Sequence, residues 1–370
     1  MYLYFNTIHY VNLEKFITMS QILTLATAGI KSDQLVDIKH LHYPRVDYFE
    51  LQKYIDSEVI DYRAYNQTRF GSLFRHWETT VRSDLYLTLL GLLQRQHHNL
   101  TFAMSERAGI PFAGGNRYFP GKRPLVSMFT CWSERQERVI KSLGLFSAMD
   151  AIIVHCQSMK QHLINLGVAP EKLHVINYSI DHKFFSPCSE IKPKLGQIMS
   201  IGEIRSRDYP TLFKAVANLP VQLTVAASGA WYAREKTRTL NEEIPSNITL
   251  TGRIPQAELR HYYAQSQFVA LPVHNVVYSA GATGILEANC MGRAVIATRS
   301  RGLTDFVIDG ETGILVEPGD VKAWREAIEH LLAHPEEARR MGQNARQRIE
   351  EELNLDRYVQ SIAQVLQKYL

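Results

Sequence analysis

The second half of this 370-residue chain alternates between short apolar runs and helical patterns. The runs are rich in Val, Ile, Leu and Ala, which is typical of strands buried on both faces of a parallel sheet. Six runs occur, at 198–202, 223–228, 248–251, 268–272, 294–298 and 313–316, and helical patterns lie between them at 211–219, 258–265 and 283–291. We therefore predict an α/β domain that binds its ligand at the carboxyl ends of the strands, where the strand order reverses.

The first half predicts a similar but less regular domain. Residues 2–8 favour a first strand, and the run at 13–28 favours an amphipathic helix that Gly29 ends. Residues 30–80 have no clear period and predict only short elements. Further strands are expected at 100–104, 125–129, 151–154 and 173–176, and helices at 83–96, at 134–143 after the cap Ser133, and from the cap Ser158 to near Gly167.

Residues 184–197 are the predicted domain boundary, because they contain Pro187 and Pro193 and show no period. A chain of this length suggests two domains. We expect these domains at residues 1–187 and 188–353. The final residues, 354–370, predict a terminal amphipathic helix with a stripe of Leu, Tyr, Val and Ile.

The net charge of +4 is too weak to indicate nucleic-acid binding. The slight basic excess of the first half is compatible with transient contact with an anionic membrane surface, although an ordinary solvated surface explains it as well. The four cysteines are scattered without a C-x-x-C pair, which indicates a reducing compartment. We therefore expect a cytoplasmic protein, with any membrane contact peripheral and at the inner face.

One segment resembles a targeting sequence. Residues 16–28 are mostly apolar and end in Ala26-Thr27-Ala28, like a signal-peptidase site. The residues before them hold Glu14 beside Lys15 rather than a basic cluster, so a first helix is favoured over a signal peptide. No segment of the sequence is long and apolar enough to predict a membrane span.

Residues 278–287 read Tyr-Ser-Ala-Gly-Ala-Thr-Gly-Ile-Leu-Glu and join a predicted strand to a predicted helix. The small residues at their centre let a ligand approach the backbone, and the free N–H groups of the helix start form a site for a diphosphate. Glu287 lies one turn after Thr283, where a carboxylate can accept hydrogen bonds from ribose hydroxyls. The alternative is that the small residues only permit close packing and that Glu287 is solvated. The candidate binding residues here are Tyr278, Ala280, Gly281, Ala282, Thr283 and Glu287.

This stretch and the segments around it resemble glycosyltransferase family 4. Residues 286–298 read Leu-Glu-Ala-Asn-Cys-Met-Gly-Arg-Ala-Val-Ile-Ala-Thr, and residues 309–320 read Asp-Gly-Glu-Thr-Gly-Ile-Leu-Val-Glu-Pro-Gly-Asp, nearly letter for letter the family's motifs. Segments at 149–158, 175–185, 251–254 and 268–272 also match. The resemblance is strong over about residues 145–355 and weak before them.

The resemblance implies a GT-B fold, in which two Rossmann-like domains face each other across a cleft and the C-terminal helix packs back onto the first domain. It implies a hexosyltransferase-type enzyme that moves a sugar from a nucleoside diphosphate sugar to a glycan, lipid or small-molecule acceptor, with retention of configuration. The first domain would bind the acceptor and the second the donor nucleotide. Neither a metal nor a cofactor is expected, because such enzymes use protein cations and a helix end.

Individual residues take their expected roles from the same resemblance. Glu287 is the second glutamate of the family's E-x7-E motif, which binds ribose, and Ile254 would meet the base through its backbone after Arg253. Residues from Gly202 onward stand where the family carries a cation near the leaving diphosphate.

For that cation Arg207 is the first candidate and Arg205 the second. The alternative is that both arginines are exposed and pair with Asp208.

Three departures from the family pattern stand out. The first glutamate of E-x7-E, which contacts the donor sugar, is Ser279 here, and the family's arginine after the first glycine is Glu203. No Gly-Gly loop follows the first strand, and Cys131 or Trp132 stands near the family's usual histidine. His9 could serve near the sugar or be a hydrogen-bonded core histidine. Two alternatives to a transferase therefore stay open: a non-catalytic relative that binds nucleotide sugar, and a GT-B nucleotide-sugar epimerase.

Overall fold

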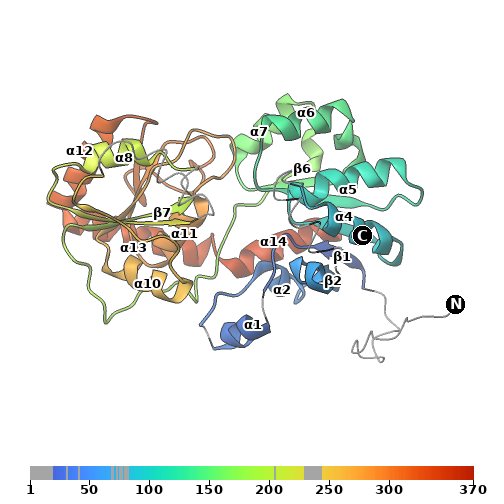
Figure 1. Cartoon of the computed structure of the whole chain (residues 1–370), viewed down its shortest axis with the longest axis horizontal. Coiled ribbons are helices and arrows are strands. Elements are labelled where there is room, and N and C mark those ends of the chain that lie inside the picture. The colour runs from blue at the N-terminus through green and yellow to red at the C-terminus, as the bar shows by residue number, and fades with distance from the viewer. Residues whose placement is uncertain are drawn as a thin grey trace.

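The computed structural model describes residues 20–30, 32–40, 42–67, 71, 74, 78, 83–203, 206–228 and 244–370. Within these ranges the chain forms two six-stranded parallel sheets, each with helices packed against it (Figure 1). The predicted α/β class with two Rossmann-like domains is confirmed. None of the helices described is long and apolar enough to cross a membrane.

The sheet of the first domain has the strand order β2-β1-β3-β4-β5-β6, and its order reverses between β1 and β3. The strands predicted from residue 100 onward are confirmed to within one residue. The strands are β1 Ile22–Leu25, β2 Ser57–Ile60, β3 Leu100–Ala103, β4 Leu125–Phe129, β5 Ala151–Val154 and β6 Leu173–Val175.

Strand β1 shows where the sequence prediction is wrong. Residues 22–25 were expected within a helix at 13–28, but they form the strand between β2 and β3, with all four side chains buried. A short apolar run does not distinguish a strand buried on both faces from a buried helix, and here the paired neighbours decide. The strand predicted at 2–8 lies outside the described residues.

Helices cover both faces of this sheet. α4 Leu85–Gln94, α5 Glu106–Tyr118, α6 Glu134–Ser142 and α7 Gln157–Asn165 pack on one face. α2 Asp47–Leu51 and the last helix, α14 Leu355–Gln367, pack on the other. The remaining elements are α1 Ser32–Lys39 and the 3-10 helices η2 Tyr62–Gln67, η3 Arg95–His97, η4 Leu145–Ala148 and η5 Pro170–Lys172.

Ser133 and Ser158 were both predicted to cap a helix, and one of the two does so. Ser133 caps α6 as expected, because its hydroxyl accepts a hydrogen bond from the amide of Gln136. The prediction for Ser158 is wrong: the residue at the cap position of α7 is Cys156, two residues earlier, and the helix begins at Gln157. The Ser158 hydroxyl instead donates to the carbonyl of Val277 at 2.7 Å, so this side chain connects the two domains.

The sheet of the second domain has the order β12-β11-β10-β7-β8-β9 and reverses between β10 and β7. All six predicted strands are confirmed to within one residue at each end, and the three predicted helices to within three. The strands are β7 Gln197–Glu203, β8 Gln222–Ser228, β9 Ile248–Leu250, β10 Phe268–Leu271, β11 Val295–Thr298 and β12 Gly313–Val316. The helices are α8 Tyr209–Val216, α10 Gln256–Gln265, α11 Ala282–Cys290, α12 Val321–Ala333 and α13 Pro335–Glu351.

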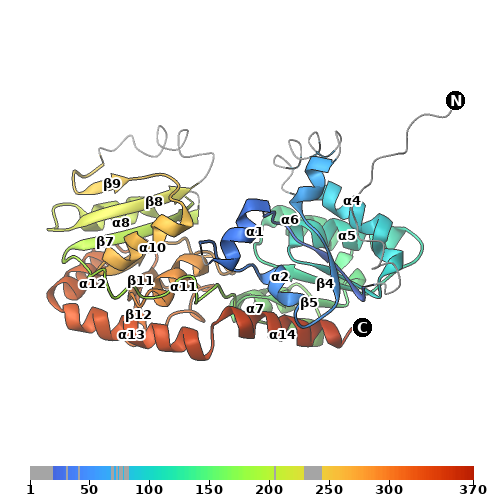
Figure 2. The ribbon, with the colours of Figure 1, turned by 90° about the horizontal axis from the view of Figure 1, so that it is seen from below.

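The chain passes between the domains twice, and the two passages lie side by side. Ile180, after β6, forms an isolated parallel bridge with Asn354, between α13 and α14. In Figure 2, α13 and α14 follow each other from the second domain to the first. The apolar stripe of α14, which includes Tyr358 and Ile362, packs on the first sheet against residues such as Phe102.

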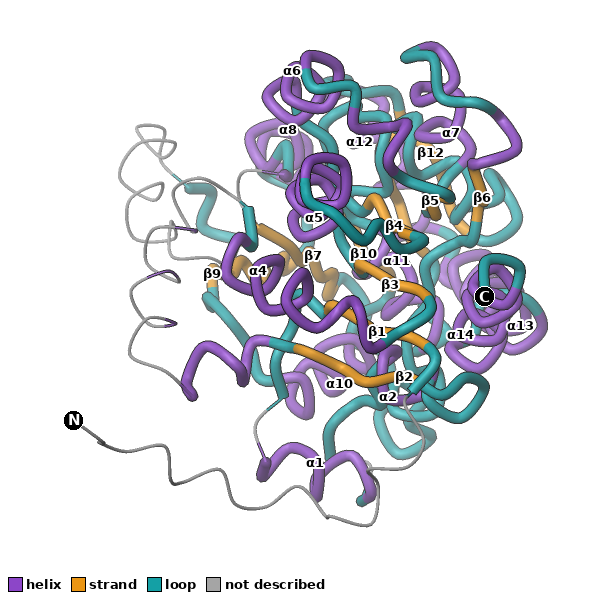
Figure 3. Tube along the Cα trace, turned by 90° about the vertical axis from the view of Figure 1, so that its right-hand side faces the viewer, coloured by secondary structure: helices purple, strands orange, loops and turns teal. Residues whose placement is uncertain are grey.

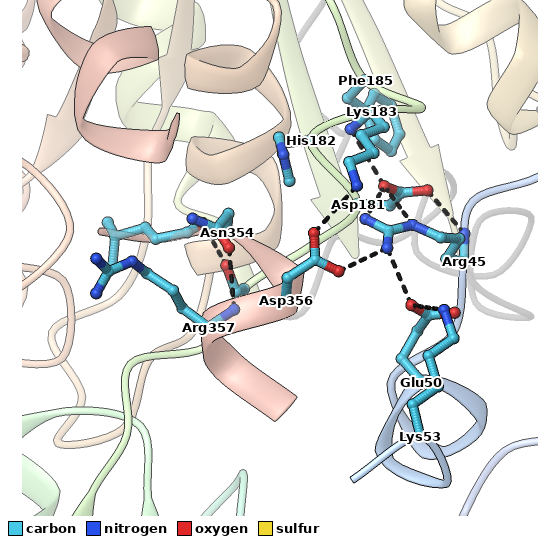
Figure 4. A network of polar contacts seen from close by, with 12 residues as sticks. Arg45, Glu50, Lys53, Asp181, His182, Lys183, Phe185, Asn354, Asp356 and Arg357 are labelled. Atoms are coloured by element: carbon cyan, nitrogen blue, oxygen red, sulfur yellow. Dashed lines mark hydrogen bonds and ion pairs between the residues drawn. The ribbon is translucent and has the colours of Figure 1, made fainter. Parts of the chain in front are cut away.

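One guanidinium connects these passages to the first domain (Figure 4). The backbone and side chain of Arg45 donate to the carboxylate of Asp181, at 2.9 to 3.1 Å. Its Nη1 also donates to Glu50 at 2.9 Å and to Asp356 at 2.7 Å. Because the side chain of Asp181 is 0 % exposed, Arg45 provides the compensating charge for a carboxylate without access to water.

Candidate nucleotide site

The candidate site lies at the carboxyl ends of β7 and β10, where the order of the second sheet reverses. After β7, Arg207 forms an isolated antiparallel bridge with Val273, which lies just beyond the end of β10. This bridge places Arg207 beside the loop that leads to α11. Parallel α/β sheets bind ligands in such crevices.

Arg207 lies almost buried at the centre of this region, with 8 % of its surface exposed. Its Nε donates to the carbonyl of Ile201 and its Nη1 to the hydroxyl of Ser206, both at 2.9 Å. Gly202 has a φ of +134°, and a Cβ at that position would overlap the guanidinium. Burial lowers the pKa of the Arg207 guanidinium from its ordinary value. No ion pair to Asp208 or any other described residue holds this side chain, in contrast to the alternative interpretation.

The N-terminus of α11 faces the same region. Gly281, with a φ of +96°, precedes the helix, and a Cβ built on it would lie 3.7 Å from Nη1 of Arg207. The amide of Ala282 donates to the carbonyl of Ser279 at 3.1 Å. Within the described ranges the amides of Gly281 and Thr283 have no partner, so they are free to bind an anion beside the guanidinium.

Glu287 is buried rather than solvated, with 6 % of its surface exposed. Its Oε2 accepts a hydrogen bond of 2.7 Å from the phenol of Tyr263, on α10. Burial raises the pKa of the Glu287 carboxyl to about 7, although the bond from Tyr263 and the positive charge of Arg207 act in the opposite direction. A carboxylate at this place in α11 can accept hydrogen bonds from hydroxyl groups.

The loop between β10 and α11 is fixed from behind by the segment that follows β11. The amide of Val273 donates to the hydroxyl of Thr298 at 2.9 Å, and that of Val276 to the hydroxyl of Ser300 at 3.1 Å. A Cβ on Gly302 would overlap the carbonyl of Tyr278. These contacts give Thr298, the last residue of the motif at 286–298, and Gly302 a structural role in holding this loop.

Ser279 and Ala280 lie half-buried at the start of this cluster, next to Tyr278. The hydroxyl of Ser279 makes no hydrogen bond to any residue that the structure describes. It is therefore available to a ligand.

Four of the candidate residues lie elsewhere or outside the described ranges. Arg253, exposed, and Ile254, half-buried, follow β9, which is separated from β7 by β8. The structure therefore does not bring them into contact with Arg207. His9 and Arg205 fall outside the described residues.

Glu106, at the first position of α5 in the other domain, was not predicted from the sequence. Its carboxylate is buried and accepts hydrogen bonds from the amide of Thr130 at 2.9 Å, its hydroxyl at 3.1 Å and the amide of Cys131 at 3.3 Å. The bonds fix the loop after β4, at the carboxyl edge of the first sheet. The signal in the sequence is that Glu106 is the single acidic residue between Leu85 and Ser133.

The first domain contacts the second close to the candidate site. The amide of Gln157 donates to the carboxylate of Asp305 at 2.6 Å, and Ser158 bonds to Val277, directly before Tyr278. The N-terminus of α7 thus lies beside the loop that leads to α11. Among the described residues, no group of three or more His, Cys, Asp and Glu side chains could hold a metal ion.

Residues 183–348 match the sequence family described as "Glycosyl transferases group 1". A curated relative, the MMP alpha-(1->4)-mannosyltransferase of Mycolicibacterium hassiacum, is 29 % identical over 238 residues, which are 61 % of this chain and 54 % of the relative. The chain spans about half the length of the curated relatives it matches. The second half of the chain is therefore similar in sequence to glycosyltransferase group 1 domains.

Two solved structures extend the comparison to both domains. The HepE protein of Anabaena, in complex with UDP and glucose, is 16 % identical with a TM-score of 0.71, over 94 % of this chain and all of that one. The sucrose-phosphate synthase of Thermosynechococcus elongatus is 22 % identical with a TM-score of 0.66, over 75 % of this chain and 76 % of that one. The chain therefore has the two-domain GT-B fold.

Proposed function

We propose that this protein is a glycosyltransferase of the hexosyltransferase type, which moves a sugar from a nucleoside diphosphate sugar to an acceptor with retention of configuration. The observation that carries the proposal is the convergence of three groups: the Arg207 guanidinium, the free amides at the start of α11 and the buried carboxylate of Glu287. A cation and a helix end neutralise a leaving diphosphate, and the carboxylate binds ribose hydroxyls.

Each group has a proposed role in the transfer. As the bond between the sugar and the diphosphate breaks, negative charge develops on the diphosphate, and Arg207 with the amides of Gly281 and Thr283 stabilises it. These groups are fixed before the reaction, because Arg207 is bound to Ile201 and Ser206. Neither a metal nor a cofactor has a step in this proposal.

The remaining candidates are assigned around this centre. Ser279 is proposed to bind a hydroxyl of the donor sugar, and Ile254, next to Arg253, the nucleotide base through its backbone. Arg205 is a second cation for the diphosphate, and His9 a residue beside the sugar. The contact of α7 with the loop before Tyr278 supports an acceptor site in the first domain, since it brings that domain to the donor loop.

The proposal draws support from what the compared proteins bind and transfer. Solved structures of the same fold hold UDP or UDP-glucose. Curated relatives are named mannosyltransferases and D-inositol 3-phosphate glycosyltransferases. We propose a hydroxylated acceptor, and a site of action in the cytoplasm with peripheral contact at the inner face of the membrane. The four unpaired cysteines are consistent with a reducing compartment.

Ser279 is the observation that favours a second candidate, a protein that binds nucleotide sugar without transferring it. The test is to screen UDP, GDP and ADP by thermal shift and then measure hydrolysis or transfer with the matching nucleotide sugars. Turnover that Arg207→Ala abolishes supports the transferase. Binding without turnover on a broad acceptor panel supports the second candidate, and conversion of UDP-N-acetylglucosamine without an acceptor identifies an epimerase.

A further inference from the structure

Three helices of the first domain end at one edge of its sheet. α4 is followed by β3, α5 by β4 and α6 by β5, so their C-terminal ends lie at the amino edge of the strands, opposite the edge that carries Glu106. Figure 3 views the molecule from this end of the domain and shows α4, α5 and α6 together on one side of the strands.

Hydrogen bonds join the three helix ends into one surface. Arg95 donates to the carbonyl of Pro120 at 2.8 Å, which connects the end of α4 with the loop after α5. Arg117, in the last turn of α5, donates to the carbonyl of Gly144 at 2.9 Å, which connects α5 with the segment after α6. We call the exposed part of this region, formed by Leu93, Tyr118, Phe119, Lys122 and Leu143, the helix-end surface.

Large apolar side chains are exposed on the helix-end surface. Leu93 is 68 % exposed, Tyr118 63 % and Phe119 60 %, and Leu143 is exposed as well. Leu89, one turn before Leu93 on α4, is exposed as well. Exposed apolar side chains that gather in one place mark an interaction surface, whereas single ones do not.

The charge of this region is unusual for the chain. From residue 85 to residue 133 the sequence holds five Lys and Arg but one acidic residue. Arg107 lies at the opposite edge, paired with Asp84 at 2.8 Å, and Arg95 is buried, so Arg117, Lys122 and Arg123 supply the positive charge of this surface. That single acid, Glu106, is buried at the opposite edge and bonded to Thr130. Lys122 is exposed, and the guanidinium of Arg117 lies 5.9 Å from the ring of Tyr118. On the neighbouring α6, Lys141 is paired with Glu137.

We propose that the helix-end surface docks on an anionic phospholipid membrane. Aromatic and aliphatic side chains beside cations fit the boundary between the acyl chains and the headgroups, where Phe119 and Leu93 would enter the apolar layer. Lys122 and Arg117 would remain among the lipid phosphates. The excess of positive charge selects an anionic bilayer over a second copy of this chain, whose same surface would repel it.

The location of the surface is compatible with the candidate site. Docking at the amino edge leaves the carboxyl edge and the contact between Ser158 and Val277 uncovered. The inference rests on the proposed membrane contact and not on the proposed transfer. It can therefore fail while the transferase proposal holds, and the reverse is also true.

The test is co-sedimentation of the full chain with vesicles of phosphatidylcholine alone or mixed with phosphatidylserine. We expect binding to the mixed vesicles only, weakened by salt. Lys122→Glu and Phe119→Ser should each lower the partition coefficient by about fivefold to tenfold, from the loss of one cation or one inserted ring. Neither side chain is buried, so both variants should keep the thermal midpoint of the unaltered protein.

Matched controls lie in the second domain. Leu195, 78 % exposed, and Lys322, whose side chain is 86 % exposed, should be replaceable by Ser and Glu without any effect on vesicle binding. Equal binding to both vesicle types, or no binding to either, would overturn the proposal. So would a dimer in analytical ultracentrifugation that Phe119→Ser dissociates, because the surface would then bind a second copy.

Discussion

The phenol of Tyr263 donates a hydrogen bond of 2.7 Å to Oε2 of Glu287, and both side chains are buried. The bond joins α10 to α11 and leaves Oε1 of the carboxylate without a partner among the described residues. Tyr263 thus fixes the orientation of the carboxylate that the proposed function assigns to ribose. The hydrogen bond also lowers the pKa of Glu287 against the rise that burial causes.

Tyr263→Phe is expected to weaken binding of whichever of UDP, GDP or ADP stabilises the protein most. Without the phenol the pKa of Glu287 should rise above about 7, so that less carboxylate is ionised at pH 7 to accept bonds from ribose. We expect a loss of about tenfold at pH 7 that becomes smaller at pH 9, measured by calorimetric titration. The neighbouring Tyr262→Phe is the control, and a loss that is the same at both pH values would assign Tyr263 a purely structural role.

Glu287→Gln should stabilise the protein without ligand at alkaline pH. The folded-state pKa of Glu287, about 7, lies above its ordinary value of 4.5, so its contribution to stability is present below pH 4.5 and is lost as the pH rises through 7. At pH 8.5 the buried carboxylate should destabilise the fold by roughly 1 to 3 kcal/mol, which the amide avoids.

Urea unfolding at pH 5 and pH 8.5 measures this difference. We expect the variant to gain stability at the higher pH and little at the lower, and to lose nucleotide affinity. Glu326→Gln, at an exposed position on α12, is the control and should change neither. A variant that is destabilised at pH 8.5 would contradict the assignment of Glu287 as a residue kept for binding.

Arg207→Ala should lower the turnover of a nucleotide sugar by at least about a hundredfold, because it removes one preorganised cation from the leaving diphosphate. Arg207→Lys should recover little, since the bonds from Nε to Ile201 and from Nη1 to Ser206 require the guanidinium. Arg325, on α12, donates to the carbonyl of Ala217 within the same domain, so Arg325→Ala controls for the loss of an arginine. Wild-type turnover in Arg207→Ala would reject this residue as the cation.

Arg45→Met should destabilise the fold by about 3 kcal/mol, because it leaves the unexposed carboxylate of Asp181 without its partner. Asp181→Asn in the same chain should restore part of this loss. Lys53 contacts Glu50, another carboxylate of the network, but is 61 % exposed, so Lys53→Met is expected to change the free energy of unfolding by less than about 1 kcal/mol. Equal losses in Arg45→Met and Lys53→Met would contradict the interpretation.

The regular parts of the fold could be predicted because their physical signals are local. The strands of the second domain are apolar runs between helical patterns, and all six appear as expected. Helix α5 was missed because Pro111 and several glycines interrupt its pattern. Pro111 frees the carbonyl of Arg107, and the amide of Asp84, before α4, satisfies it at 3.0 Å. No local pattern reveals such a long-range partner.

The candidate site also has features that the sequence predicts and features that it does not. The helix start at Gly281 can be predicted from the run of small residues, and the resemblance to glycosyltransferase family 4 places Ser279 where an acid is expected. The burial of Glu287 and its bond to Tyr263 depend on how α10 packs against α11, and the contact between Gly202 and Arg207 depends on the return of the chain after β7. These relations arise from packing between elements, which a single sequence does not specify.

Ser279→Ala should separate recognition of the sugar from recognition of the nucleotide. Its hydroxyl makes no hydrogen bond to any described residue, so its removal leaves the protein's own bonds intact, including the one from the amide of Ala282 to the Ser279 carbonyl. We expect affinity for the nucleoside diphosphate to be unchanged and affinity for the matching nucleotide sugar to fall by about threefold to tenfold, the contribution of one hydrogen bond. Titration of the same preparation with both ligands measures the two constants. If both fall together, the hydroxyl contacts the diphosphate, and if neither falls, the sugar is held by other residues.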